Sequence, residues 1–180
     1  FAVDTMESAV IDSLPGFRQR MEWFIANRPD LCQNLAPLMR HGVAERHLLS
    51  VVTPERLVRV LEKLLDEAEF LSPHGIRSVS KFHADHPYSL RVDGQEHQVD
   101  YEPAESRTGL FGGNSNWRGP VWFPINYLLI ESLQRFEYYF GNELQVEFPT
   151  GSGRRMHLGE VAAELSRRLS RIFLRDGQGR

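Results

Sequence analysis

Residues 108–127 read TGLFGGNSNWRGPVWFPINY and join a glycine-rich loop to the start of a helix. The loop carries Trp117 and Trp122 beside Arg118 and several asparagines. Its glycines let the backbone approach a ligand closely. Flat aromatic faces next to amide and guanidinium donors suit a sugar, which has apolar CH faces and a rim of hydroxyls. The same residues are equally typical of a tightly turned loop whose aromatics fill the core above the next helix.

Helical periodicity appears on both sides of this loop. From about Pro124, apolar residues follow helical spacing until Gly141, which suits a C-terminal cap. An earlier helix starts at Thr53, because Thr53 can accept from free backbone donors and Pro54 fits the first turn. The apolar stripe of this earlier helix runs to about Phe70.

Further helices are predicted over residues 17–27, 31–40 and 158–174. The last of these helices places an apolar set on its buried face: Val161, Leu165, Leu169, Ile172 and Phe173. Its arginines, Arg167, Arg168 and Arg171, are predicted to form a solvated face rather than a nucleic-acid footprint.

A β-hairpin is predicted between the helical regions. Residues 88–92 and 95–99 read as strands that flank Asp93-Gly94, and this dipeptide between two such runs is a strong hairpin signal. Helices of this length joined by long decorated loops suit a helical toroid better than a tight four-helix bundle. The sequence therefore predicts a mainly α fold with one hairpin insertion near residues 88–99.

Composition restricts the class of protein. The chain has 180 residues, of which 41% are hydrophobic and 25% charged, as in an ordinary globular domain. A net charge of -3 gives no basic field for nucleic acid or an anionic membrane, and no apolar run reaches the ~20 residues of a membrane span. Cys32 is the single cysteine, which excludes an internal disulfide. We expect a cytoplasmic protein without cofactor or metal.

The run from Asn114 to Trp122 closely resembles the Asn-x-x-Trp-Arg-Gly-Pro-(Ile/Val)-Trp signature of glycoside hydrolase family 63. Residues 70–78, 86–88 and 101–106 look like the bacterial glucosidase-like members of that family, among them glucosylglycerate and mannosylglycerate hydrolases. The resemblance extends over essentially the whole chain. It implies that residues 1–180 are one partial domain, the C-terminal part of an (α/α)6 toroid of the six-hairpin glycosidase type.

The resemblance also implies a chemistry, namely inverting hydrolysis of α-glucosidic or α-mannosidic bonds by one carboxylic acid and one carboxylate. In the family the general acid precedes this part of the chain and the general base follows it, so no catalytic residue is expected within residues 1–180. The residues that carry over form a sugar-binding wall: Asn114, Asn116, Trp117, Arg118, Trp122 and Asn126. Glu102 and Glu105 are expected to orient the loop or to contact sugar hydroxyls.

Two other classes of function stay open. One is a non-catalytic carbohydrate-binding or regulatory module, and the other is a helical interaction protein whose aromatic loop docks a partner. If both chain ends lie inside a toroid, helix faces that should be buried are exposed, and large exposed apolar patches find partners. We therefore expect a carbohydrate substrate as ligand and self-association of the 180-residue chain.

Overall fold

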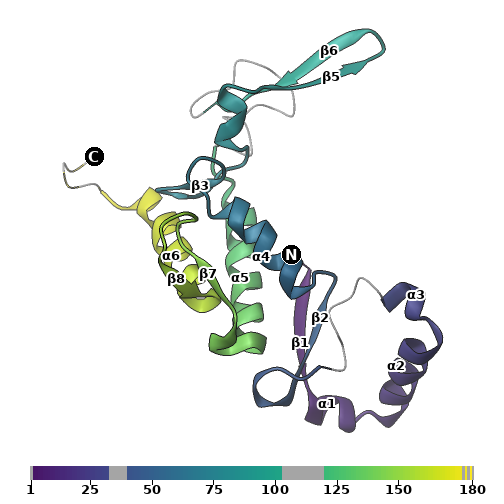
Figure 1. Ribbon diagram of the computed structural model, residues 1–180. Helices are drawn as coiled ribbons and strands as arrows, with labels where there is room; N and C mark the ends of the chain where they lie inside the picture. The colour runs from purple at the N-terminus through teal and green to yellow at the C-terminus, as the bar shows by residue number, and fades with distance from the viewer. Residues whose placement is uncertain (1, 33–39, 103–119, 176, 178, 180) are drawn as a thin grey trace.

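The computed structural model describes residues 2–32, 40–102, 120–175, 177 and 179 (Figure 1). Its longer helices are α2 (Pro15–Asn27), α4 (Pro54–Leu64), α5 (Phe123–Phe140) and α6 (Leu158–Ser170). The shorter helical elements are α1 (Ser8–Asp12), α3 (Pro29–Cys32), η1 (Val43–Glu45), η2 (Lys81–Ala84), η5 (Gly141–Glu143) and η6 (Arg171–Phe173). The strands are β1 (Val3–Glu7), β2 (Arg46–Ser50), β3 (Leu71–Ser72), β4 (Gly75–Ile76), β5 (Tyr88–Val92), β6 (Gln95–Val99), β7 (Gln145–Glu147) and β8 (Arg155–His157).

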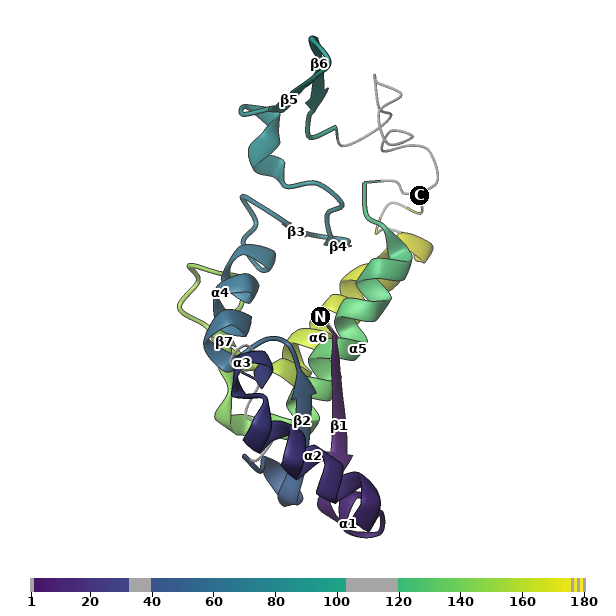
Figure 2. The ribbon, with the colours of Figure 1, turned by 90° about the vertical axis from the view of Figure 1, so that its right-hand side faces the viewer.

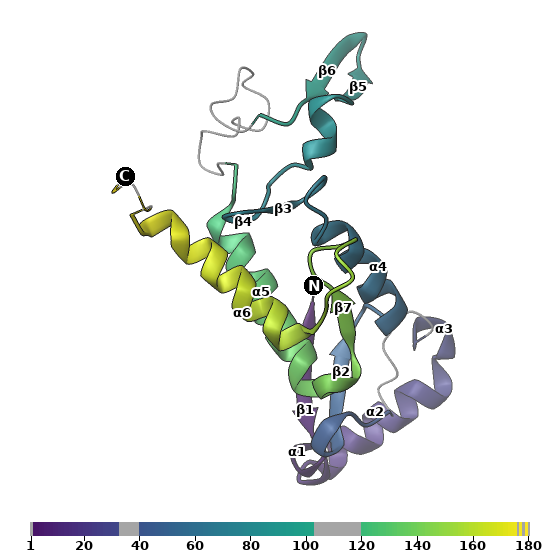
Figure 3. The same cartoon turned by 60° about the vertical axis from the view of Figure 1, so that its left-hand side comes forward.

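The hydrophobic core lies between three helices. Helices α5 and α6 run side by side in Figures 1 to 3, and α4 faces them across the core. Leu57 and Leu61 of α4, Leu133 and Phe136 of α5 and Leu165 of α6 are all at most 1% exposed. These positions follow the predicted apolar stripes, because residues three and four apart share one face of a helix.

Helix α4 begins as predicted and ends early. The Thr53 hydroxyl accepts from the Arg56 backbone N–H, and Pro54 opens the first turn. The helix stops at Leu64 rather than near Phe70, because the Asp66 carboxylate accepts from the Ala68 N–H at 2.8 Å and turns the chain.

The described residues form four separate two-stranded antiparallel sheets, β1–β2, β3–β4, β5–β6 and β7–β8. The prediction of a mainly helical part of an (α/α)6 toroid is therefore wrong for these residues, in which helices alternate with hairpins and no toroid is formed. Three of these sheets gave no signal in the sequence. The strands of β3–β4 and β7–β8 are only two and three residues long, too short to show an alternating pattern. Strands β1 and β2 lie at opposite ends of the first fifty residues, so their pairing is not visible from neighbouring residues.

The predicted hairpin at residues 88–99 is confirmed. Tyr88 pairs with Val99 and Val92 with Gln95. Asp93 and Gly94 both have positive φ angles, 50° and 80°, as the tight turn between twisted strands requires. This hairpin projects away from the helical core at the far end of the molecule from α1 (Figures 1 and 2).

The N-terminal helices α1 to α3 stand apart from the core (Figure 3). Helix α2 has no buried residue, so the apolar residues that indicated it, such as Phe17 and Phe24, are partly exposed. At the other end of the chain, Ile172 and Phe173 lie in η6 and are 47% and 74% exposed, which corrects the prediction that both are buried. The helix predicted at 31–40 falls largely on residues 33–39, outside the described residues. None of the described helices combines the length and apolar character needed to cross a membrane.

Two leucines on α5 offer a matched test of this core. Leu133 is 0% exposed and Leu128 is 53% exposed. We predict that Leu133→Ala lowers the free energy of unfolding of the chain by about 2–5 kcal/mol, because it leaves a cavity between α5 and its neighbours. Leu128→Ala should change it by less than about 0.5 kcal/mol. Urea unfolding followed by circular dichroism measures both, and equal losses would contradict the assigned core.

Candidate functional site

The short hairpin β3–β4 lies over the N-terminal end of α5 and beside α6 (Figures 2 and 3). Leu71 pairs with Ile76 and Ser72 with Gly75. The Ser72 hydroxyl donates to the Gly75 carbonyl at 2.7 Å and accepts from the His74 N–H at 3.1 Å. This polar turn therefore satisfies its own backbone groups.

The side chain of Asn126 fastens this hairpin to α5. Asn126 is 3% exposed, and its Oδ1 accepts from the Ile76 N–H at 2.7 Å. Its Nδ2 donates to the Ile76 carbonyl at 2.9 Å and to the Trp122 carbonyl at 3.1 Å. Both protons of the amide nitrogen are thus engaged with backbone. The predicted contact of Asn126 with a sugar stays a prediction, and the structure adds this second role.

Gly75 makes the close approach of Asn126 possible. A Cβ at position 75 would lie 2.7 Å from Oδ1 of Asn126, and Gly75 has a φ of +115°. Both the space and the backbone conformation therefore require glycine. The sequence indicated neither constraint, because the two residues are far apart along the chain.

Arg168 holds the hairpin from the side of α6. Its guanidinium donates to the Ser72 carbonyl at 2.9 Å and to Glu164 at 3.1 Å, and lies 5.1 Å from the ring centre of Phe148. The Arg168 side chain is only 13% exposed, which corrects its assignment to a solvated face, whereas Arg167 is 62% exposed. Burial alone would raise the pKa of Glu164, but hydrogen bonds from the two arginines outweigh it and leave this pKa lowered.

Arg77 binds the turn that leads into the hairpin. Its guanidinium donates to three backbone carbonyls, those of Glu67 at 3.2 Å, Glu69 at 3.3 Å and Leu71. It also lies 5.9 Å from the ring centre of Tyr101. All three bonds come from one nitrogen, Nη1, whose two protons are shared among the three carbonyls. Sequence reasoning gave Arg77 no role, and only its place within the family-like run 70–78 could have marked it.

Glu69 connects the same turn to η2. Its carboxylate accepts from Lys63 Nζ at 2.8 Å and from the Ser80 hydroxyl, and its backbone carbonyl accepts from the Lys81 N–H at 2.9 Å. The hydrogen bond from Lys63, followed by that from Ser80, holds the pKa of Glu69 below its ordinary value of 4.5. The carboxylate is therefore ionised and structural at neutral pH.

Residues 76–83 anchor the two described segments that flank residues 103–119. The Ser78 N–H donates to the Pro120 carbonyl at 2.8 Å, and the Tyr101 N–H donates to the His83 carbonyl at 3.3 Å. Trp122 is half-buried at the N-cap of α5, and Glu102 is buried at 9% exposure. The structure thus brings Trp122 and Asn126 together at the start of α5, while Glu102 lies beside Tyr101 in the segment held by His83. The other predicted site residues, Asn114, Asn116, Trp117, Arg118 and Glu105, lie outside the described residues.

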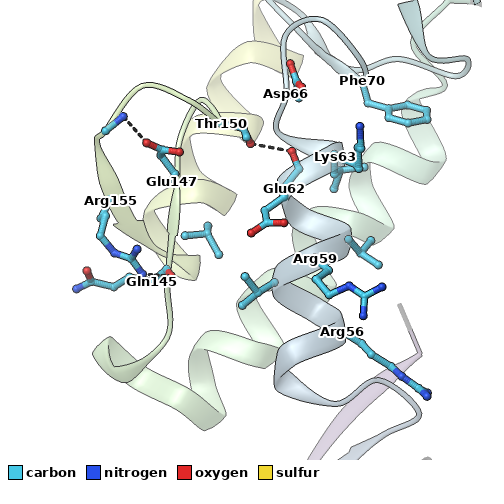
Figure 4. Close-up of a pocket in the computed structure, with 15 residues that line it drawn as sticks. Arg56, Arg59, Glu62, Lys63, Asp66, Phe70, Gln145, Glu147, Thr150 and Arg155 are labelled. Carbon is cyan, nitrogen blue, oxygen red and sulfur yellow. Dashed lines mark hydrogen bonds between the residues drawn. The ribbon is translucent and has the colours of Figure 1, made fainter. Parts of the chain in front are cut away.

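A large hollow of the described surface lies elsewhere. It is an open groove of about 1410 Å³ between α4 and β7–β8 (Figure 4), and it contains none of the predicted site residues. Its charged groups include Arg56, Arg59 and Glu62. Across it the Thr150 hydroxyl donates to the Glu62 carbonyl at 2.8 Å, a bond that joins β7–β8 to α4. We place the candidate site at the β3–β4 hairpin, because residues there hold the described segments on either side of residues 103–119.

The hydrogen bonds by which Asn126 fastens β3–β4 to α5 are called the Asn126 clip, and removal of the amide tests them. We predict that Asn126→Leu lowers the free energy of unfolding by at least about 2 kcal/mol, because it leaves the Ile76 N–H and carbonyl buried without their partner. Asn27→Leu is the matched control, since the Asn27 amide donates to the Trp23 carbonyl on the exposed surface of α2. Chemical unfolding measures the free energy of unfolding of both variants. An equally small decrease in the two would contradict the role assigned to the Asn126 amide.

The Glu69 contacts predict a pH dependence. A carboxylate whose pKa is lowered on folding stabilises the fold above its unfolded pKa, and this contribution is lost as the pH falls through the folded value. Glu69→Gln should therefore destabilise the chain at pH 7, and its difference from the wild type should shrink as the pH falls below 4.5. Thermal unfolding from pH 3 to pH 7 measures this. A difference that stays constant over the range would contradict the ionic role.

Comparisons with known proteins support the glycoside hydrolase class that the sequence predicted. Residues 47–178 match the model of the mannosylglycerate hydrolase MGH1-like glycoside hydrolase domain. The uncharacterized protein YMR196W of Saccharomyces cerevisiae is 51% identical over 180 residues, which is 99% of this chain and 16% of the yeast protein. The chain thus spans about one sixth of that relative's length. No solved structure matches the chain. The narrower assignment to glycoside hydrolase family 63 stays a prediction. The chain belongs to the MGH1-like glycoside hydrolase domain family.

Proposed function

We propose that the chain is the sugar-binding part of an inverting O-glycoside hydrolase that acts on α-linked glucose or mannose. The family match over residues 47–178 is the observation that carries the hydrolase class. Inversion needs a general acid at the leaving oxygen and a general base at an attacking water, roughly 6.5–9.5 Å apart. We assign both groups to parts of a longer polypeptide outside these 180 residues.

The contribution of this chain is to hold the sugar in place. The β3–β4 hairpin, clipped by Asn126 and bound by Arg168, supports the N-cap of α5, where Trp122 lies. We assign to Trp117 and Trp122 the faces on which the apolar side of a sugar ring stacks, and to Arg118 a fixed polar contact. A rigid support matters because small displacements of a bound substrate reduce the rate steeply.

The proposal is tested first on the yeast relative and on a chimera, defined as the yeast protein in which this chain replaces the aligned segment. Both are incubated with α-linked glucosides and mannosides, including mannosylglycerate and glucosylglycerate, and the released sugar is followed by NMR. We expect the β-anomer to form first, because inversion converts an α-linkage into a β-product. Initial release of the α-anomer would contradict inversion. Folded proteins that bind a sugar but hydrolyse none would favour the sugar-binding module.

The assigned stacking face gives a second prediction. Trp122→Ala in the chimera should reduce kcat/KM at least about tenfold, which corresponds to about 1.4 kcal/mol of lost transition-state binding. The matched control is Trp23→Ala, since Trp23 lies on α2 far from the hairpin and is 61% exposed. Unchanged turnover in a folded Trp122→Ala chimera would remove Trp122 from the site.

A further inference from the structure

The first half of α5 exposes a group of large apolar side chains. Phe123, Ile125, Tyr127 and Leu128 are 43%, 39%, 59% and 53% exposed. These four residues are called the α5 patch below. Single exposed apolar residues are ordinary on a protein surface, but a contiguous group on one helix marks a contact surface.

The opposite side of the same helical turns is already buried. Asn126 and Ile130 are 3% and 8% exposed and face the hairpin and the core. Residues 123–130 are therefore apolar around the whole circumference of the helix except at Asn126, whose amide is bound to backbone. A helix that is hydrophobic all round is normally covered on every side. Only one side of this one is covered by the described residues.

The patch has a sharp boundary. One turn further along, Gln134 and Arg135 are exposed and Glu131 is half-buried, and Arg135 pairs with Asp4 of β1 at 3.1 Å. The outer face of α5 is thus polar over residues 131–135. Further on, the exposed ring of Tyr138 lies against the Arg46 guanidinium and its hydroxyl donates to Glu7. The apolar character of the first half is a local feature of the surface and does not follow from the general composition of the helix.

Two neighbouring features extend the α5 patch. A hollow of about 410 Å³ lies between α5 and β1, where Val3, Leu128 and Leu129 contribute apolar walls. Its other side is polar and includes Asp4, Glu131 and Arg135. On another side, the ring of Phe173 meets that of Phe123 edge to face, with centroids 5.6 Å apart, and Phe173 is itself 74% exposed. The surface therefore combines a hollow that can receive an apolar side chain with protruding aromatic rings.

The length of the yeast relative indicates what covers this surface. That protein aligns with 99% of this chain, and the aligned segment is only 16% of its length. A segment tethered to the same polypeptide acts at an effective concentration in the millimolar range, which favours it over a second copy at ordinary protein concentrations. We propose that the α5 patch is the docking surface for an apolar segment of the same, longer polypeptide that lies outside these 180 residues. This holds whether or not the protein hydrolyses a glycoside.

Hydroxyl-radical labelling read by mass spectrometry tests the proposal on the chimera and on the 180-residue chain. Phe123, Tyr127 and Leu128 should be labelled several-fold less in the folded chimera than in the folded 180-residue chain, at every chimera concentration. Leu133 and Phe136, both 0% exposed, report that the domain is folded. Labelling of the patch in the chimera as strong as in the 180-residue chain, with Leu133 and Phe136 protected in both, would overturn the proposal. Protection that grows with chimera concentration would assign the surface to a second copy instead.

A pair of substitutions adds an independent readout. Leu128→Glu should lower the midpoint of thermal unfolding of the chimera by roughly 4 °C or more, because it places a charge in a buried apolar contact. The same change should leave the midpoint of the 180-residue chain within about 1–2 °C, since Leu128 is exposed there. Gln134→Glu, at an exposed position in the second half of α5, is the matched control and should change neither. An unchanged midpoint in the Leu128→Glu chimera would contradict the docking surface.

Discussion

The buried amide of Asn126 joins two segments that lie fifty residues apart in the sequence. One amide satisfies both backbone groups of Ile76 and also binds the carbonyl of Trp122, so the hairpin and the start of α5 share one fixed geometry. Because an unpaired buried backbone group costs about 1–3 kcal/mol, this contact restricts what position 126 can be. It also fixes Gly75, whose missing Cβ leaves room for the amide. The candidate site is arranged around this contact.

Near the Asn126 contact, two arginine side chains donate hydrogen bonds to backbone carbonyls. Arg77 donates to the carbonyls of Glu67, Glu69 and Leu71, and Arg168 donates to that of Ser72. Each closes a turn that has few ladder hydrogen bonds of its own, which explains how two-residue strands are stable here. The β3–β4 hairpin is therefore held by hydrogen bonds to backbone carbonyls, whereas the core between α4, α5 and α6 is held by apolar packing.

The sequence predicted the elements that depend on residues close together in the chain, namely helix starts and tight turns. Thr53 and Pro54 marked the start of α4, and Asp93-Gly94 marked a hairpin, because caps and tight turns depend on neighbours in the chain. The sheet β1–β2 and the roles of Arg168 and Asn126 escaped prediction, because they depend on partners that only tertiary structure brings near. The toroid was inferred from helix and loop lengths as well as from a resemblance, and the hairpins among the described helices contradict it.

The claim that the Asn126 amide fixes the β3–β4 hairpin onto α5 is tested most directly by native-state hydrogen exchange of the Ile76 amide. If the clip holds, this amide exchanges as slowly as the amide of Leu133 in the buried part of α5, and both respond alike to added denaturant. Exchange as fast as that of the exposed β5–β6 hairpin would contradict it. In that case the hairpin would open independently of α5, and the support assigned to the sugar site would be lost.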